Sequence, residues 1–461
     1  MRVSMAVGTG RAAAAALMAL AIAACGRSHD AAKASATDST ATTAKAATPK
    51  GCDADNGGLT LPNGFCASVF ADHLGHPRHL AVAPNGVVYV NTWSGRYYGN
   101  DTTPAGGFLV ALRDTSGSGH ADVIQRFGPD AKAGGHGGTG IALHGAWLFA
   151  EESDRIVRYA MPTAGIAPTG RPDVVVSGMP LGGDHPMHPF AIDTSGAVFV
   201  DMGSATNSCQ LKNRTLHSPG HQPCTELATR GGIWRFDGNR TGQHFSPSAR
   251  YATGIRNAVG IAFTPNGALF STQHGRDQLS SNWPEHYTTE QSAELPAEEL
   301  MHIEHGADYG WPFCYFDGSQ KKLMLAPEYG GDGTKVGLCD KKRAPVAFFP
   351  AHWAPDGLTF YSGSSFPAHY RGGAFIAFHG SWNRAPLPQG GYLVAFVPFQ
   401  GDTASGPYET FADGFAGANK QPDAAAHRPA GVAVGPDGAL YIADDAHGRV
   451  WRVTYHGAAG Q

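Results

Sequence analysis

Short apolar runs joined by tight turns recur along the chain. Most units have an apolar run, a turn that carries Pro-Asn-Gly, Pro-Asp-Gly or Ser-Gly, and a second run rich in β-branched and aromatic residues. Such runs, separated by turn-forming residues, predict antiparallel strand pairs. The pattern occurs, with a degenerate fifth copy, at residues 80–90, 140–149, 190–200, 260–270, 358–378 and 431–442.

A further short apolar segment, suited to a third strand, follows most of these pairs. These segments are residues 107–112, 155–159, 232–236, 299–303, 392–396 and 449–453. Six units of three or four strands predict an all-β fold, a six-bladed β-propeller. The units are unevenly spaced, often beyond the usual 40–50 residues or so per blade, which predicts long inter-strand insertions. A two-sheet sandwich is the alternative, but six similar units favour radial repetition.

Composition narrows the class of protein further. Of the 461 residues 62 are glycine and only 16% are charged, which argues against a helix-rich protein. The formal net charge of −4 argues against nucleic acid as a partner, since proteins that bind it usually present a basic face.

The N-terminal residues are typical of an exported protein. Residues 1–25 combine early arginines with a short apolar segment and end in Ile-Ala-Ala-Cys25, which resembles the lipobox of a bacterial lipoprotein. We expect a signal peptide over 1–25, lipidation at Cys25, a flexible Ala/Thr/Ser/Lys linker over 26–50 and the propeller over 51–457. The protein would then be periplasmic or at the cell surface, with the membrane contacted only through its lipid anchor. An ordinary cleaved signal with an incidental Cys25 is the alternative.

Six further cysteines follow Cys25. An even number in an oxidising compartment indicates disulfides, and six cysteines allow fifteen connectivities. The cysteines fall into three pairs of near neighbours, so we expect bonds between Cys52 and Cys66, Cys209 and Cys224, and Cys314 and Cys339. Zinc is the alternative, but the chain lacks the C-x₂-C spacing of many zinc sites.

The propeller geometry predicts a site. Residues just before the first strand of each unit should meet at one mouth of the central channel, and antiparallel pairing returns the end of the second strand to the same rim. These residues are His79, His136, His185 with His188, Arg256 with Asn257, His352 with Trp353, and Arg428, together with residues 273–276 and 379–384. We therefore expect a funnel of imidazole and guanidinium groups, which suits a ligand with several carboxylates.

Five segments carry a resemblance to a known family. Residues 183–185, 254–267, 273–276, 308–312 and 378–384 are similar to the soluble sugar dehydrogenases that depend on pyrroloquinoline quinone (PQQ). Over residues 60–455 or so, the chain most closely resembles the sorbosone dehydrogenase-like and aldose sugar dehydrogenase branch. The resemblance implies a six-bladed propeller with PQQ at the channel mouth beside Ca²⁺.

The resemblance also implies roles for individual residues. His185 matches the general base that takes the proton of the substrate hydroxyl, and Arg256 the group that stabilises the oxyanion developing on the quinone. Asn257 matches a neighbouring cofactor contact. Gly275 and Arg276 match the positions whose backbone carbonyls hold calcium.

Other matches are looser, and the chain departs from the family at several positions. Arg384, which replaces a lysine of the glucose-oxidising relatives, and Arg428 fall near cations that bind the PQQ carboxylates. His136 and Trp353 fall near cofactor-facing positions, although both would equally suit packing of the funnel. Val259 replaces a cofactor-binding glutamine, which removes one expected hydrogen bond to the cofactor. Ser204 replaces the aspartate that orients the histidine, and Asp201 or Asp184 is expected to substitute for it.

We therefore expect an enzyme that oxidises an aldose or related sugar, such as a sorbosone-like one, to a lactone or acid. Electrons would leave for an external acceptor, a cytochrome or quinone, because the chain has no C-x-x-C-H haem motif. One alternative is a calcium-dependent propeller hydrolase of the lactonase kind, which carboxylates at the mouth would favour. The other is a non-catalytic cell-surface binding propeller.

Overall fold

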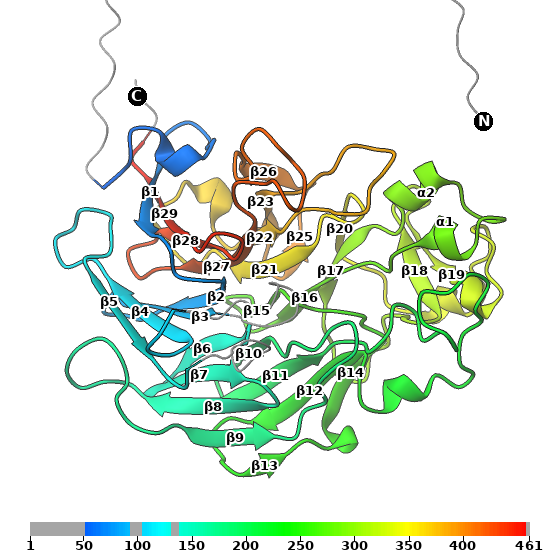
Figure 1. Cartoon of the computed structure of the whole chain (residues 1–461), viewed down its shortest axis with the longest axis horizontal. Helices are drawn as coiled ribbons and strands as arrows, with labels where there is room; N and C mark the ends of the chain where they lie inside the picture. Colours follow the sequence, from blue (N-terminus) through cyan, green and yellow to red (C-terminus); the bar gives the residue numbers. More distant parts are fainter. Residues whose placement is uncertain (1–50, 93–103, 131–137, 458–461) are drawn as a thin grey trace, which may run out of the picture. The chain divides into compact units, whose positions relative to one another are not determined.

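The repeated units fold as four-stranded antiparallel sheets, seen in a computed structural model that describes residues 51–92, 104–130 and 138–457 (Figure 1). From the channel outward, the first sheet has β2 (Pro77–Val82), β3 (Val88–Thr92), β4 (Leu109–Arg113) and β5 (Val123–Phe127), and the second has β6 (Ile141–His144), β7 (Trp147–Glu152), β8 (Arg155–Ala160) and β9 (Asp173–Ser177). In the same order, the third has β10 (Phe190–Ile192), β11 (Ala197–Met202), β12 (Gly232–Asp237) and β14 (Arg250–Thr253). The other three are β15 (Ile261–Phe263), β16 (Leu269–Gln273), β17 (Glu298–His302) and β20 (Ala347–Phe349); β21 (Pro355–Phe360), β22 (Ala374–Phe378), β23 (Leu393–Val397) and β26 (Glu409–Ala412); and β27 (Pro429–Val434), β28 (Leu440–Asp444), β29 (Val450–Tyr455) and β1 (Phe65–Ala71).

The innermost strands of these sheets form a closed ring. β2 contacts β6, β6 contacts β10, β10 contacts β15, β15 contacts β21, and β21 contacts β27, which returns to β2. A two-sheet sandwich could not give six inner strands that each touch two neighbours around a circle. The predicted six-bladed β-propeller is confirmed.

The last blade joins the two ends of the described chain. Its three inner strands are C-terminal, and its outer strand is β1, which pairs antiparallel with β29 from Phe65 opposite Tyr455 to Ala71 opposite Val450. Trp451 of β29 is fully buried, and its indole N–H donates to the carbonyl of Gly57 at 3.0 Å. The ring is therefore closed by strand pairing between the two ends.

Side chains on both faces of a blade pack against the neighbouring blades. All five residues of β22 are buried, as are all five of β28, which requires apolar cover on both faces. A cluster between the last two blades includes Phe375, Phe396, Ile442 and Trp451. This two-sided burial explains why the middle strands are continuously apolar instead of alternating.

The predicted insertions are present and gather at one side of the propeller (Figure 1). One spans residues 203–231, between β11 and β12, and another carries α1 (Leu279–Asn282) and α2 (Thr289–Glu294). A third carries the hairpin of β18 (Cys314–Asp317) and β19 (Lys322–Leu325). The buried Glu328 carboxylate joins all three, because it accepts hydrogen bonds from Ser208, Arg276 and Trp283.

Smaller features complete the fold. β13 (Gln243–His244) adds to β9 in parallel, and β24 (Phe399–Gln400) pairs with β25 (Thr403–Ala404). The three predicted disulfides are confirmed: Cys52–Cys66, Cys209–Cys224 and Cys314–Cys339. Within the described ranges, no helix is long and apolar enough to cross a membrane. The predicted signal peptide, Cys25 and linker lie outside the described residues.

Candidate active site

A cavity of about 500 Å³ opens where the ends of the inner and second strands meet. Its wall contains residues from loops before inner strands and from loops after second strands, as the propeller geometry predicts. The cavity wall shares these residues with the predicted mouth: His185, Arg256, Asn257, His274, Gly275, His352, His379, Gly380, Trp382, Asn383 and Arg428. Its volume falls within the usual range of small-molecule sites, roughly 300–1,000 Å³.

His185 lies in the loop before β10 and is 9% exposed. Its Nδ1 atom lies 3.0 Å from the carbonyl oxygen of Ser204, which can only accept a hydrogen bond, so Nδ1 carries the proton. Nε2 makes no hydrogen bond to any residue that the structure describes. Burial, together with the positive charges of Arg256 and His274, lowers the pKa of His185 well below 6.5. The imidazole is therefore neutral at neutral pH, with Nε2 as its proton acceptor.

The group that orients His185 is Ser204 itself. Its hydroxyl oxygen lies 2.9 Å from Nδ1, while the hydroxyl proton is donated to the carbonyl of Thr206 at 2.7 Å. The expectation that Asp201 or Asp184 would substitute is wrong. Asp201 is fully buried and accepts from the backbone N–H of Ala258, and Asp184 binds Arg214.

Each nitrogen of the Arg256 guanidinium contacts an oxygen of the protein. It lies in the loop before β15 and is 3% exposed. Nε donates to the carbonyl of Asn207 at 3.0 Å, Nη1 to the carbonyl of Gly275 at 2.9 Å, and Nη2 contacts Asp277 Oδ2 at 3.1 Å. Burial lowers the pKa of Arg256, and the Asp277 charge opposes that shift. The neighbouring Asn257 also lines the cavity.

Asp277 accepts from two arginines, Arg214 and Arg256. Oδ2 lies 3.0 Å from Arg214 Nη2 and 3.1 Å from Arg256 Nη2, and Oδ1 accepts from Asn383 Nδ2 at 2.8 Å. Although burial alone would raise it, the pKa of Asp277 is lowered by Arg256, Arg214 and His352. The carboxylate is therefore ionised across the physiological range.

A second set of paired charges lies at the cavity. Arg78 Nη1 lies 3.0 Å from an Asp356 oxygen and 2.5 Å from an Asp445 oxygen. His274 Nε2 lies 3.0 Å from Asp356, and His379 Nε2 lies 2.6 Å from Asp445. Although burial opposes it, the Asp356 carboxylate raises the pKa of His274. These side chains come from four blades and bind them to one another around the channel.

The predicted role of His79 is wrong, because Arg78 takes its place on the cavity wall. The pairing of β2 with β3 shifts register between Pro77 and Leu80, as β21 and β27 also do near their first residues. His79 instead contacts the carbonyl of Asp356 through Nε2 at 2.8 Å. Burial lowers the pKa of His79 to about 4.

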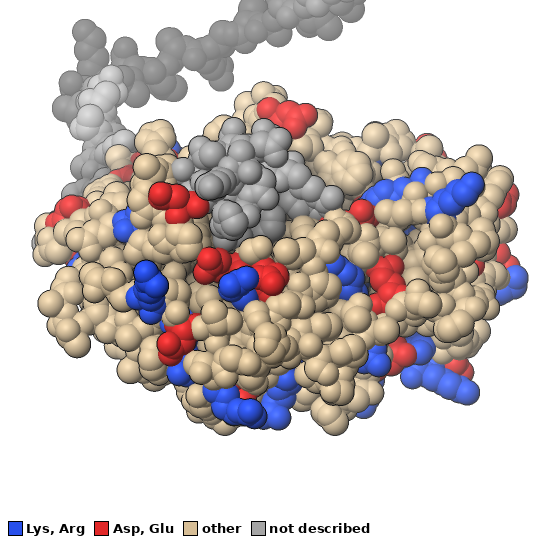
Figure 2. Space-filling model, turned by 60° about the horizontal axis from the view of Figure 1, so that its bottom comes forward, with Lys and Arg blue, Asp and Glu red and all other residues tan. Residues whose placement is uncertain are grey.

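Arginine and histidine side chains line the mouth as expected, but the sequence prediction did not include the carboxylates beside them. Four carboxylates line the same cavity, from Asp184, Asp277, Glu298 and Asp356. Three of them contact arginines, and Glu298 accepts from the backbone N–H groups of Gly275 and Ala354. The cavity is thus a surface of paired charges. The face in Figure 2 likewise shows acidic and basic side chains interspersed among mostly uncharged ones.

Of the two arginines expected to bind the cofactor carboxylates, Arg428 lines the cavity and Arg384 does not. Arg428 lines the cavity, donates to the carbonyls of His379 and Gly380, and lies 5.6 Å from the centre of the Tyr392 ring. Arg384 is not in the wall; it donates to the carbonyls of Ala351 and Pro388.

Trp353 does not line the cavity either. It packs on Phe378 and Tyr408, as the packing alternative expects, and the 55% exposed Trp382 is the cavity's tryptophan. His188 is buried and contacts the carbonyl of Pro180. His136 lies outside the described residues.

The predicted calcium ligands are placed unequally. Gly275 is in the cavity wall, but its carbonyl oxygen accepts a hydrogen bond from Arg256. Arg276 is not in that wall, and its buried side chain forms an ion pair with Glu328. The carbonyl oxygen suits calcium by its chemistry, whereas the guanidinium beside it opposes a second cation there.

The sequence prediction missed Arg78, Arg214, Asp277, Glu298 and Asp356. Asp277 directly follows one of the segments that carry the family resemblance, so adjacency was an available signal. Arg214 had none, because it lies in an insertion far from any strand end. Its approach to Asp184 and Asp277 depends on how that insertion folds back.

Comparison with known proteins places the chain in a family. The family model described as TrAA12-like matches residues 59–456. An uncharacterized protein of Borreliella burgdorferi is 31% identical over 207 residues, which cover 44% of this chain and 48% of the relative. The PQQ-dependent pyranose dehydrogenase of Coprinopsis cinerea is 26% identical over 238 residues, covering 43% of this chain and 30% of that protein. The matches thus span about half or less of these relatives.

Solved structures show the same fold. The PQQ domain of the Coprinopsis cinerea pyranose dehydrogenase superposes with a TM-score of 0.66 at 19% identity, over 86% of this chain and 97% of that one. The calcium structure of the Trichoderma reesei enzyme of carbohydrate-active family AA12 gives 0.67 at 19% identity, over 86% and 97%. The predicted kinship with PQQ-dependent sugar dehydrogenases is confirmed, and the chain belongs to the TrAA12-like family.

Proposed function

We propose that this protein oxidises a sugar with PQQ as its cofactor. The observation that carries the proposal is His185, a buried neutral imidazole in a cavity wall, with Nδ1 bound to Ser204 and Nε2 without a partner among the described residues. That arrangement is the one a general base requires. The Coprinopsis cinerea relative, named a PQQ-dependent pyranose dehydrogenase, supports the same chemistry.

The residues of the cavity fit an organic polycarboxylate. PQQ carries several carboxylates, and guanidinium groups bind carboxylates through paired donors. Arg428 is the best candidate, because it donates to the carbonyl oxygens of His379 and Gly380 and not to a carboxylate of the described residues. Bound PQQ would supply the acceptor for the hydride of the substrate carbon. Calcium is the second proposed ligand, and we assign no step to it because Arg256 holds the Gly275 carbonyl.

The chain's own residues would carry the proton. His185 Nε2 would accept the proton of the sugar hydroxyl as the hydride leaves the carbon that bears this hydroxyl. Ser204 would keep the other ring nitrogen protonated and the ring in place. Arg256, fixed nearby, would stabilise negative charge that develops at the site.

The finer features of the activity are proposals of the same kind. An aldose or sorbosone-like sugar would be oxidised to a lactone or acid, and an external cytochrome or quinone would take the electrons. The enzyme would be exported and anchored through a lipid on Cys25. Incorporation of labelled palmitate, lost in Cys25→Ala, tests the anchor.

A calcium-dependent hydrolase is the second candidate, and one observation favours it. Four carboxylates line the cavity, which is the feature expected of a lactonase-like site. Hydrolysis of a lactone panel with calcium and without PQQ would identify this activity.

The deciding experiment is reconstitution of the purified protein with PQQ and calcium, followed by dye reduction across a panel of aldoses and sorbosone. We expect PQQ to raise the melting temperature and at least one sugar to support turnover that His185→Asn abolishes. Dye reduction by no sugar, without any thermal shift by PQQ, would overturn the proposal.

A further inference from the structure

The insertion between β11 and β12 reaches the candidate active site through one side chain. Cys209 and Cys224 are disulfide-bonded within it, and Arg214 lies between them. The backbone N–H of Arg214 donates to Gln210 Oε1 at 2.7 Å, which fixes the turn from which the side chain extends. Arg214 thereby becomes part of the cavity wall.

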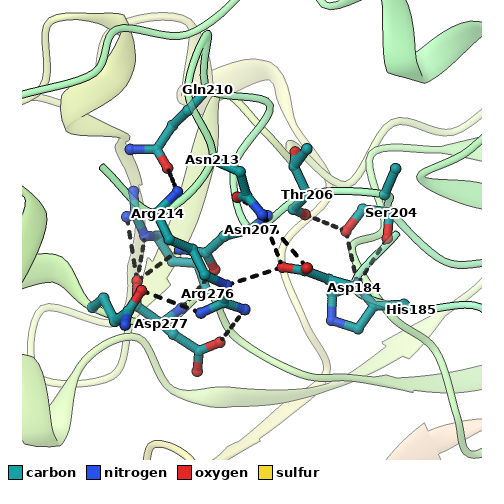
Figure 3. A network of polar contacts seen from close by, with 12 residues as sticks. Asp184, His185, Ser204, Thr206, Asn207, Gln210, Asn213, Arg214, Arg276 and Asp277 are labelled. Atoms are coloured by element: carbon teal, nitrogen blue, oxygen red, sulfur yellow. Dashed lines mark hydrogen bonds and ion pairs between the residues drawn. The ribbon is translucent and has the colours of Figure 1, made fainter. Parts of the chain in front are cut away.

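Arg214 ends on two carboxylates of the cavity. Nε donates to Asp184 Oδ2 at 3.0 Å, and Nη2 to Asp277 Oδ2 at 3.0 Å (Figure 3). Asp184 directly precedes His185, so the insertion contacts the loop that carries the candidate base. Asp277 lies in the loop after β16, beside the Gly275 and Arg276 positions.

The same Asp277 oxygen also contacts Arg256 at 3.1 Å. Two guanidinium groups therefore share one carboxylate oxygen. The side chain of Arg256 is 4% exposed, and that of Arg214 is 28% exposed. Like charges placed so close repel strongly where water is scarce, and the carboxylate between them offsets that repulsion, with Asp184 as a second acceptor for Arg214.

We propose that Asp277 is a positioning residue that holds Arg256 at the active site, and that the disulfide-bonded insertion is coupled to catalysis through this Arg214–Asp277–Arg256 bridge. The proposal rests on the proposed function, because Arg256 is the group through which Asp277 would act. Asp277 itself need not touch the substrate. Its oxygen sets where the guanidinium of Arg256 lies, and Arg214 anchors that oxygen from the insertion.

Charge rescue tests the bridge. In Asp277→Asn, the negative charge that offsets the repulsion between the two arginines is lost, so Arg256 should move away from its position. In the double variant Asp277→Asn/Arg214→Gln, the repelling neighbour is also gone, and Arg256 should recover much of its position. Asp332→Asn, which changes an aspartate that pairs with Lys335 outside the cavity, is the matched control.

Two readouts are measured on each variant. The first is the urea midpoint of the protein without cofactor, which needs no activity. We expect Asp277→Asn to lower it and the added Arg214→Gln to recover part of the loss. The second is turnover of the PQQ-loaded enzyme, where we expect kcat to fall at least 10-fold in Asp277→Asn, with a smaller change in KM, and to recover at least 3-fold in the double variant.

Each result decides a separate statement. The single variant Arg214→Gln completes the cycle, and if the urea effects of the two substitutions simply add, the bridge is overturned, whatever the activity. If they are coupled but kcat is unchanged in Asp277→Asn, the positioning role is overturned. A wild-type protein without sugar oxidation would refute the proposed function and the positioning role with it, while coupled unfolding would still show the bridge.

Discussion

The Nδ1 atom of His185 lies 3.0 Å from the carbonyl oxygen and 2.9 Å from the hydroxyl oxygen of the same residue, Ser204. A backbone carbonyl cannot be removed by substitution, so half of this orientation belongs to the fold itself. The ring keeps its tautomer without a carboxylate bound to Nδ1, and the opposing charge of Asp277 does not overcome the lowering of its pKa by burial. The site therefore combines a firmly placed base with a low affinity for protons.

Replacing the base should remove turnover and leave the fold intact. For His185→Asn, we expect kcat/KM of the PQQ-loaded enzyme to fall by about 10²–10⁴, the usual contribution of a general base. The measurement is steady-state dye reduction with the best sugar. His369→Asn, at an exposed histidine paired with Glu409, is the control and should retain activity. Equal losses in both variants would contradict the assignment.

Activity should persist to lower pH than an ordinary histidine allows. Because burial, Arg256 and His274 lower the pKa of His185 well below 6.5, Nε2 stays unprotonated at pH 6.5 and accepts protons there. We expect kcat/KM to fall only when the pH drops through this lowered pKa. An acid limb with its midpoint at or above pH 6.5 would contradict the structure.

The lowered pKa of His185 should also make the free energy of unfolding depend on pH. Below about pH 6.5, the unfolded chain protonates this histidine, whereas the folded protein resists it. His185 thus contributes stability above that pH, and the contribution is lost as the pH falls. Urea midpoints of wild type and His185→Asn between pH 5 and 7.5 would show a wider gap at higher pH.

Ser204→Ala should be a mild variant. It removes the hydroxyl acceptor, but the carbonyl at 3.0 Å still binds Nδ1, so we expect kcat/KM to fall less than 10-fold. Asp201→Asn, at the residue first expected to orient the ring, should leave the pH profile of kcat/KM unchanged, since its carboxylate accepts from Ala258 and not from His185. A displaced acid limb in Asp201→Asn would show that it acts on the base after all.

The two arginines first expected at the cofactor should differ in their effects. Arg428→Gln removes a cation from the cavity wall, and a lost hydrogen bond to a charged group costs about 1.5–3 kcal/mol. We expect PQQ affinity, measured by titration of activity and by fluorescence quenching, to weaken by about 10–100-fold. Arg384→Gln should change it little, because Arg384 donates to Ala351 and Pro388 outside the wall.

Much of the architecture could be predicted because its signals are local. A hairpin such as residues 431–442 encodes its own turn and both strands, and six such hairpins are enough to identify radial repetition. Local pairs of cysteines likewise gave the correct disulfides. The choice of Arg78 over His79 for the cavity wall was not predictable, because it depends on the register of β2, and the order of residues does not give that register.

The charge of the site could not be predicted because it is assembled across blades. Asp356 is one residue into β21, yet its role depends on Arg78 and His274 from two other blades. Arg214 and Asp277 are 63 residues apart. Counting cations at one phase of the repeat found Arg256 and Arg428 but missed Arg78, Arg214 and the cavity carboxylates, because these pairs form only in the assembled ring.

The pairing of β1 with β29 also has a consequence for synthesis. A polypeptide that emerges from the ribosome or through a translocon with its N-terminus first exposes β1 long before residues 450–455 exist to cover it. Until then, the remaining blades are an open arc with apolar flanks at both ends. The ring therefore closes only when β29 is available to pair with β1. A chaperone that covers the unpaired strand edge until then would matter more here than in a fold completed from neighbouring segments.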